Sequence, residues 1–117
     1  MLSKDNSINL EDFRARDEKR DILAKVFTGR DRGKAVREKS KLDEIEASYD
    51  SVNIIVPEDI YSINPSFFEE LFVNVVKKLG KNDFLKKFKF TYQGYDFEDK
   101  LIEAIERILR DTTALDR

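Results

Sequence analysis

The stretch VNIIVPEDIYSINPSFFEELFVNVVKKLG, residues 52–80, decides the fold of this chain. Its residues 54–56 are three consecutive β-branched apolar residues, which are typical of a strand buried on both faces of a sheet. Pro57 ends this strand because proline has no amide to donate to a strand ladder. The apolar residues that follow recur at helical spacing and predict a helix over 65–79: Phe67, Phe68, Leu71, Phe72, Val75, Val76 and Leu79.

Both ends of this helix have recognisable signals. Asn64 is a strong N-cap residue, because its side-chain oxygen can accept a hydrogen bond from a free backbone amide. Pro65 suits the first helical position, where no amide is needed. Gly80 suits the C-terminal end, because glycine tolerates positive φ. The helix start therefore explains most of the residues between 62 and 66.

The flanking sequence repeats the alternation of strand and helix. Towards the N-terminus we expect a strand at 22–28, a turn from Gly29 to Gly33 and a helix over 31–47. Towards the C-terminus we expect a short turn and a strand within 84–92. A last helix follows, and Asp96 is its predicted N-cap. The apolar residues expected on its inner face are Leu101, Ile102, Ile105, Ile108 and Leu109.

The alternation predicts one small α/β domain with a mainly parallel sheet and right-handed crossovers. Within residues 8–21, Ile8, Leu10 and Phe13 fit a short edge strand, whereas the charged residues 15–21 favour a helical or exposed connector. We therefore assign 1–21 to an N-terminal extension or edge element, 22–111 to the α/β domain and 112–117 to a C-terminal tail that frays.

Composition excludes several kinds of site. The 117 residues are 40% hydrophobic and 39% charged, with a net charge of -2, which disfavours a general polyanion binder. The chain has no cysteine and no histidine, so disulfides, thiolate zinc sites and a Ser-His-Asp triad cannot form. We expect no metal, because the commonest metal ligand is missing, and we expect no cofactor. We expect a cytoplasmic protein, because no signal-peptide pattern or membrane-length apolar run is present.

A glycine-flanked basic segment, TGRDRGKAVREK at 28–39, resembles a phosphate-binding loop without matching it. The glycine spacing is one residue too short, and Ala35 stands where that loop needs a hydroxyl. A small anion or nucleotide could still bind a cluster of cations near a helix N-terminus: Arg30, Arg32, Lys34 and Arg37. The alternative interpretation is a solvated basic face that pairs with nearby acids.

Two further charged groups have structural and functional interpretations. The six lysines of residues 77–89 could suggest nucleic acid, but Phe84 and Phe88 between them fit a core better, so we expect no nucleic-acid binding. Carboxylates follow the central strand and continue into the helix at Glu58, Asp59, Glu69 and Glu70. Strand ends often form sites in α/β proteins. Glu69 and Glu70 also fit a helix start electrostatically.

The run from residue 52 to residue 92 resembles the STAS-like domain family of unannotated function, which is similar to the sulphate-transporter and anti-sigma-factor-antagonist fold. The family pattern has a hydrophobic strand, a short loop, I-S-x-S-F, an acidic leucine- and phenylalanine-rich helix and a closing F-K-F-like strand. The residues that match it are Ile63, Ser66, Phe67, Glu70, Leu71 and Phe72. The similarity extends over residues 52–109 and, more loosely, over 22–51.

The resemblance implies a non-catalytic module that binds a protein. In antagonist proteins of this fold, a serine at the loop–helix junction is phosphorylated by an ATPase-like partner kinase that docks on that surface. The antagonist pattern D-S-S-G is replaced here by Asn64-Pro65-Ser66-Phe67, so proline occupies the usual phosphoserine place. Ser66 and Ser62 remain as acceptors, and of the two we take Ser66 as the candidate for phosphorylation.

The sequence therefore leads to one main hypothesis and two alternatives. The main hypothesis is a non-enzymatic regulatory domain in a bacterial-type cytoplasm. It would dock a protein partner, for example an ATPase-like kinase or another regulator, through the loop and helix start after the central strand. The residues expected at this surface are Glu58, Asp59, Ser62, Asn64, Ser66 and Glu69. The alternatives are an anion or nucleotide binder using the turn at 29–37 and an enzyme with carboxylate-bound magnesium. We expect no membrane contact, and a homodimer could form through exposed sheet edges.

Overall fold

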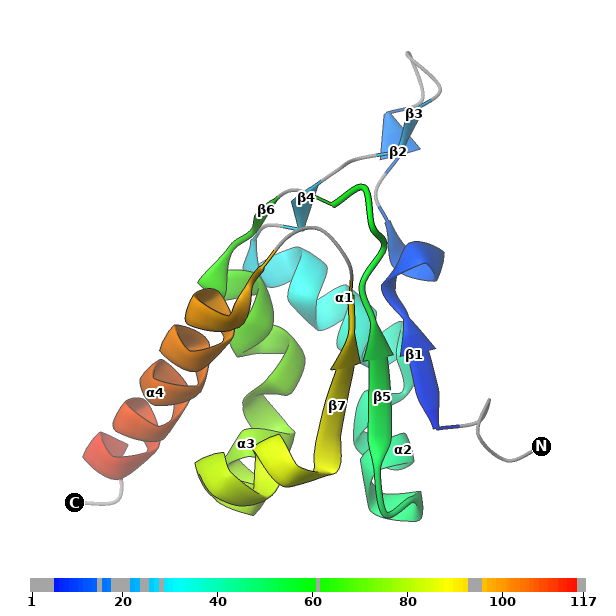
Figure 1. Ribbon diagram of the computed structural model, residues 1–117. Coiled ribbons are helices and arrows are strands. Elements are labelled where there is room, and N and C mark those ends of the chain that lie inside the picture. The colour runs from blue at the N-terminus through cyan, green and yellow to red at the C-terminus, as the bar shows by residue number, and fades with distance from the viewer. Residues whose placement is uncertain are drawn as a thin grey trace.

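The structure is a computed structural model that describes residues 6–14, 16–17, 22–23, 26–27, 29–60, 62–92 and 96–115. Its central element is a three-stranded parallel sheet with the order β1 (Ser7–Asn9), β5 (Val52–Ile55) and β7 (Phe88–Thr91). The strand predicted after residue 51 is the middle strand, as Figure 1 shows. The predicted α/β class with parallel pairing is confirmed.

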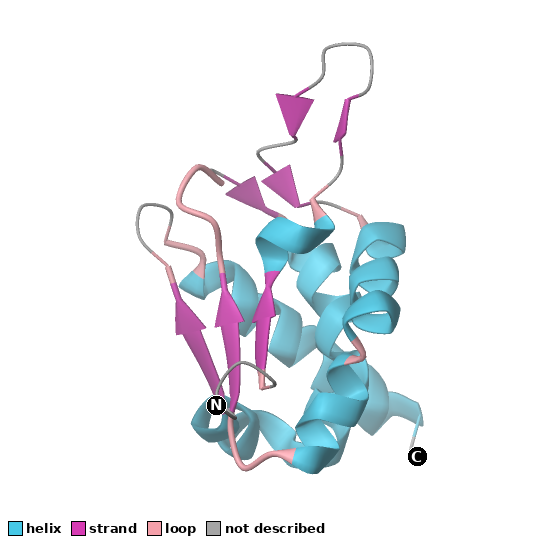
Figure 2. Ribbon diagram, turned by 90° about the vertical axis from the view of Figure 1, so that its right-hand side faces the viewer, coloured by secondary structure: helices cyan, strands magenta, loops and turns pink. Residues whose placement is uncertain are grey.

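The helices cover one face of this sheet, and the other face is open (Figure 2). Along β5, Val52 and Ile54 are fully buried, whereas Asn53 and Ile55 are half-buried on the opposite face. The prediction that this strand is buried on both faces is therefore wrong. The open face is mostly polar, because Lys89 pairs in register with Asn53 and the Thr91 hydroxyl donates to the Asn53 Oδ1 at 3.1 Å.

The longest helix, α3 (Pro65–Lys87), begins as predicted and is interrupted at Gly80. Gly80 has φ of 80° and ψ of 171°, a conformation that non-glycine residues rarely adopt. The chain then resumes a helical course up to Lys87, so residues 84–87 are helical where a turn was predicted. The interruption lets α3 run along the sheet and then turn back into β7 (Figure 1).

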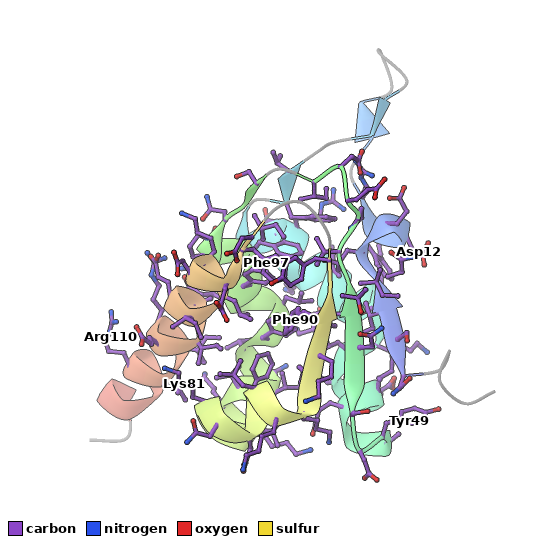
Figure 3. All side chains as sticks on the ribbon, viewed as in Figure 1. Asp12, Tyr49, Lys81, Phe90, Phe97 and Arg110 are labelled. Atoms are coloured by element: carbon purple, nitrogen blue, oxygen red, sulfur yellow. The ribbon has the colours of Figure 1, made fainter. Side chains whose placement is uncertain are left out.

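Helix α4 (Glu98–Leu115) has the predicted cap, because the Asp96 Oδ1 accepts a 3.0 Å hydrogen bond from the Glu98 amide. Helix α4 continues to Leu115, through most of the region predicted to fray. Phe97, just before this helix, packs against Phe90 on β7, and Figure 3 shows the two rings meeting between the elements. The start of α4 is thereby attached to the edge of the sheet.

The predicted helix over 31–47 is two helices, α1 (Arg30–Ser40) and α2 (Leu42–Ser48). They are separated by Lys41, which adopts a left-handed conformation with φ of 59°. The turn predicted from Gly29 to Gly33 is wrong, because Arg30 already belongs to α1 and Gly33 lies inside it. Gly33 faces α3 so closely that a Cβ there would lie 2.4 Å from the Phe67 carbonyl oxygen.

The described residues of the N-terminal part form short strands, one of which is an edge element as expected. Ile8 lies in the edge strand β1, as expected, and is followed by a single 3-10 turn, η2 (Leu10–Phe13). An antiparallel pair, β2 (Arg16–Asp17) with β3 (Ile22–Leu23), projects from the body (Figure 1). The predicted connector at 15–21 is thus partly strand, and its other residues lie outside the described part.

The single strand predicted over 22–28 is also wrong. It is divided between β3 and β4 (Val26–Phe27), and β4 pairs in parallel with β6 (Ser62–Ile63) in a separate two-stranded sheet. Residues 24, 25 and 28 lie outside the described part. The pairing of β4 with β6 brings the segment before α1 next to the start of α3, because the Asn64 amide donates to the Phe27 carbonyl oxygen at 2.9 Å.

The core between sheet and helices is rich in phenylalanine. Phe72 on α3 is fully buried and contacts four other rings, with centroid separations between 5.0 and 6.0 Å: Phe68, Phe84, Phe88 and Phe90. Further ring contacts extend from this centre to Phe27 on β4 and to Tyr92 after β7. Among the described residues, no helix has both the length and the apolar character needed to cross a membrane.

Candidate functional site: the carboxyl end of the sheet

The three parallel strands end at the same edge of the sheet, and a depression of about 340 Å³ lies there. Residues at or just beyond the end of each strand line it, which is the usual position of binding sites in parallel α/β sheets. β1 contributes Asn9, η2 contributes Glu11, and β7 contributes Thr91 with Tyr92 after it. The end of β5 and the turn that follows contribute the rest. The lining residues are Asn9, Glu11, Ile55, Val56, Pro57, Glu58, Asp59, Thr91 and Tyr92.

Arg14 holds the turn after β5 in place. Its guanidinium donates to both carboxylate oxygens of Asp59 at 2.9 Å and to Glu11 at 2.8 Å, and its side chain is only 3% exposed. The hydrogen bond to Asp59 raises the pKa of Arg14 above its ordinary value, although burial acts in the opposite direction. Bidentate arginine–carboxylate pairs have a defined geometry, so Asp59 is well positioned.

The rim of the depression is acidic. Glu11 and Asp59 keep about half of their side-chain surface in solvent while sharing Arg14. Glu58 is exposed and has no hydrogen bond or ion pair with any described residue. The rim therefore carries three carboxylates, of which Glu11 and Asp59 share one guanidinium. Tyr92, 44% exposed, adds an aromatic surface beside them.

The other residues predicted to dock a partner lie on β6 and the start of α3. Ser62 is part of β6, and Asn64 is the predicted N-cap, with its Oδ1 accepting from the Ser66 amide at 3.2 Å and from the Ser66 hydroxyl at 3.3 Å. Ser66 is half-buried. These residues do not line the depression. The structure thus brings Glu58 and Asp59 together with Glu11 and Tyr92, rather than with Ser66.

Glu69 is buried inside the helical layer. It is 6% exposed, and its two carboxylate oxygens accept from Arg30 on α1 at 3.1 Å and from Arg107 on α4 at 2.9 Å. The hydrogen bond to Glu69 raises the pKa of Arg107. Glu69 joins three helices, and its carboxylate oxygens are used in doing so.

The four residues of α1 that the sequence predicted to bind an anion lie in different environments. Arg30 and Arg37 face α3, where Arg30 pairs with Glu69 and Arg37 pairs with Glu70 at 3.4 Å and also donates to the Glu70 backbone oxygen. Lys34 is exposed, and Arg32 lies near η2 on another side of the helix. The cluster is therefore not one anion site, because the helix divides its members among several faces.

A buried carboxylate that sequence reasoning did not single out lies on α2. Glu46 is 2% exposed and accepts from Lys78 and from Lys87, each at 2.8 Å. Two of the six lysines at 77–89 therefore donate to a carboxylate of the protein itself. A third, Lys81, pairs with Glu106 at 3.7 Å. The helical spacing of Leu42, Ile45 and Glu46 could have placed Glu46 on the inner face.

Among the residues that the structure describes, no group of three or more acidic side chains is arranged to hold a metal ion. Comparison of the chain with protein-family models, with curated proteins and with solved structures gives no match. The resemblance to STAS-like domains therefore stays a prediction from the sequence.

Proposed function

We propose that this chain is a non-catalytic, STAS-like regulatory domain that docks a protein partner at the carboxyl end of its sheet. The observation that carries the proposal is the depression of about 340 Å³ whose acidic turn is fixed by Arg14. A turn held in place before binding loses little conformational entropy when a partner arrives. The docking residues are Glu58 and Asp59, as the sequence indicated, together with Glu11 and Tyr92.

The charge of the surface indicates the partner's chemistry. Glu58 is exposed and unpaired among the described residues, and it stands beside two carboxylates that share one arginine. A partner that presents lysine or arginine would meet a complementary potential there, which speeds encounter and suppresses acidic competitors. Tyr92 offers an amphipathic ring of the kind that often anchors protein interfaces.

The resemblance suggests an ATPase-like kinase or a related regulator as the partner, acting in a bacterial-type cytoplasm. Ser66 is the proposed phosphoacceptor of such a kinase. Its position in the first turn of α3 supports this, since a phosphate there would be stabilised by the helix dipole. Its hydroxyl is half-buried and bonded to Asn64, so phosphorylation would have to break that hydrogen bond.

The proposal is tested by affinity capture from the native host with the wild-type chain and two charge reversals. Glu58→Lys changes the rim of the depression, and Glu44→Lys makes the same change at an exposed position of α2. We expect a partner that binds the wild type and the Glu44→Lys variant but is lost with Glu58→Lys. Both variants should keep the wild-type melting temperature, because both positions are exposed.

Retention of every captured protein by Glu58→Lys would remove this surface from consideration. Repetition with ATP, and with Ser66→Asp, separates the kinase proposal from the docking proposal. Loss of the partner with Ser66→Asp supports phosphorylation as the regulatory step. An unchanged partner in that variant removes Ser66 and leaves the docking surface standing.

A further inference from the structure

Helix α1 carries cations on two sides with different surroundings. On the side that faces α3, Arg30 and Arg37 are bonded to glutamates, as described above. On the side that faces η2, Arg32 and Lys39 lie seven residues apart, which is two helical turns and places them above one another. The cations facing α3 are thus neutralised by glutamates within the fold, whereas Arg32 and Lys39 have no such partner among the described residues.

A small cavity of about 100 Å³ lies between this second side of α1 and the segment around η2. Arg32 and Lys39 line it, with the apolar residues Ala35 and Val36 of the same helix. Across from them are residues 12–14, so that Arg14 forms part of the opposite wall. The Arg14 side chain is almost completely buried, and its charge is balanced by Asp59 and Glu11, so this part of the wall is rigid and the unpaired cations of the cavity are Arg32 and Lys39.

The cavity contains more positive than negative charge. Arg32 is half-buried, and neither Arg32 nor Lys39 has a hydrogen bond or ion pair with any described residue. Asp12 is the carboxylate that lines the cavity, and its exposed side chain extends from the surface of η2 (Figure 3). A partly desolvated cation without a counter-ion is costly, so an anion between these groups would be stabilised.

We propose that this cavity is a binding site for a phosphate group, held by Arg32 and Lys39 against the wall that Arg14 provides. Arginine offers a planar pair of donors that matches two phosphate oxygens, and lysine adds a compact charge. The volume is close to that of three water molecules at about 30 Å³ each, which suits one phosphate group. Pockets for whole nucleotide-sized ligands are larger, about 300–1,000 Å³.

This site goes beyond the docking function and differs from the anion site predicted from the sequence. It keeps Arg32, replaces the paired Arg30 and Arg37 with Lys39 and Arg14, and leaves out Lys34, which does not line the cavity. The ligand is either free inorganic phosphate or the phosphate of a small ester, because both present the same oxyanion. A nucleotide base or ribose would remain outside the cavity and add nothing to the affinity.

The test is calorimetric titration of the whole chain with inorganic phosphate, with sodium chloride adjusted to hold the ionic strength constant. We expect saturable binding with one site per chain. Arg32→Gln and Lys39→Gln should each weaken it about tenfold or more, since each removes a charged hydrogen-bond donor. Lys34→Gln removes the same charge from an exposed position of the same helix and should leave the affinity within twofold.

Absence of saturable binding to the wild type would overturn the proposal, and so would an equal loss in all three variants, which would indicate general charge screening. Melting curves of each variant without phosphate show whether it is folded. If Arg32→Gln does not fold, Lys39→Gln alone tests the proposal. Parallel titrations with glycerol 3-phosphate and ATP show whether the bound phosphate group is inorganic phosphate or part of a phosphate ester. Tighter binding of the ester than of inorganic phosphate assigns the site to a phosphorylated metabolite, and much tighter binding of ATP contradicts the stated size limit.

Discussion

At the scale of single residues, Gly33 sets the distance between α1 and α3. A Cβ at this position would lie 2.4 Å from the Phe67 carbonyl oxygen and 2.9 Å from the Glu70 Cβ. These contacts belong to backbone and to the root of a side chain, so neither can move aside without shifting a helix. The close approach also brings Arg37 near enough to donate to the Glu70 backbone oxygen.

We therefore expect Gly33→Ala to destabilise the protein by about 1–3 kcal/mol, the usual cost of overpacking. The sign is informative, because the same substitution in an unobstructed helix stabilises by about 1 kcal/mol through helix propensity. Urea denaturation of the two proteins measures the difference. Lys34→Ala, at the exposed neighbouring position, is the control and should lie within about 0.5 kcal/mol of the wild type. A stabilising Gly33→Ala would contradict the packing of α1 on α3.

At the scale of elements, Glu46 connects α2 to both sides of the interruption in α3. Lys78 precedes Gly80 and Lys87 follows it, and both ammonium groups donate to the same buried carboxylate. Lys87 also donates to the Glu46 backbone oxygen at 2.7 Å. The connection holds the two parts of α3 at a fixed angle, which in turn directs the chain into β7.

Burial alone would raise the pKa of Glu46, but the hydrogen bonds from Lys78 and Lys87 outweigh it and lower the pKa below its ordinary value of 4.5. A carboxylate with a depressed folded-state pKa stabilises the protein above its unfolded-state pKa, and this contribution is lost as the pH falls through the folded-state value. Glu46→Gln should therefore cost about 2 kcal/mol at neutral pH, as expected for charged hydrogen bonds.

The measurement is urea denaturation of wild type and Glu46→Gln from pH 7 down to pH 3. The difference in unfolding free energy should be constant above about pH 5 and should shrink below the ordinary pKa of 4.5. The exposed Glu44→Gln is the matched control and should lie within about 0.5 kcal/mol of the wild type at neutral pH. A Glu46→Gln difference that stays constant down to pH 3 would contradict the lysine contacts.

The sequence predicted those elements whose signals are local. Four predicted features depend on residues within a few positions of one another, and each is found. They are the central strand, the capped start of α3, the positive φ of Gly80 and the Asp96 cap. The turn predicted from Gly29 to Gly33 was wrong, because glycine is common in turns whereas Gly33 lies inside α1 and packs closely against α3. A glycine selected for close packing cannot be distinguished from a turn glycine without knowing its neighbour.

The site was predicted only in part, for a similar reason. Glu58 and Asp59 follow directly from their place after a strand, and they do line the depression. Glu11, Arg14 and Tyr92 come from distant parts of the chain and meet there only once the register of β1, β5 and β7 is fixed. The pairing of Glu69 with Arg30 and Arg107 likewise depends on how three helices pack.

At the scale of the whole molecule, the domain has two layers, with helices on one face of the sheet (Figure 2). Adjacent residues of β5 test this directly. Ile54 is 0% exposed, whereas Ile55 is half-buried on the open face. We expect Ile54→Ala to cost about 2–5 kcal/mol, as in other cores, and Ile55→Ala to cost less than about 1 kcal/mol. Equal costs in urea denaturation would indicate that something covers the second face.

The edge strand β1 has a consequence for the order of events during folding. The Asn6 side chain donates to the Ser51 backbone oxygen, 45 residues later, and β1 then pairs with β5 along its length. Bringing such distant segments together has an entropic cost that increases with the length of the enclosed loop. Of the three strands in this sheet, β1 is synthesised before its partner β5, which follows only after α1 and α2. We therefore expect residues 7–9 to join the sheet late in folding, because their contacts with β5 join parts of the chain that are far apart in sequence.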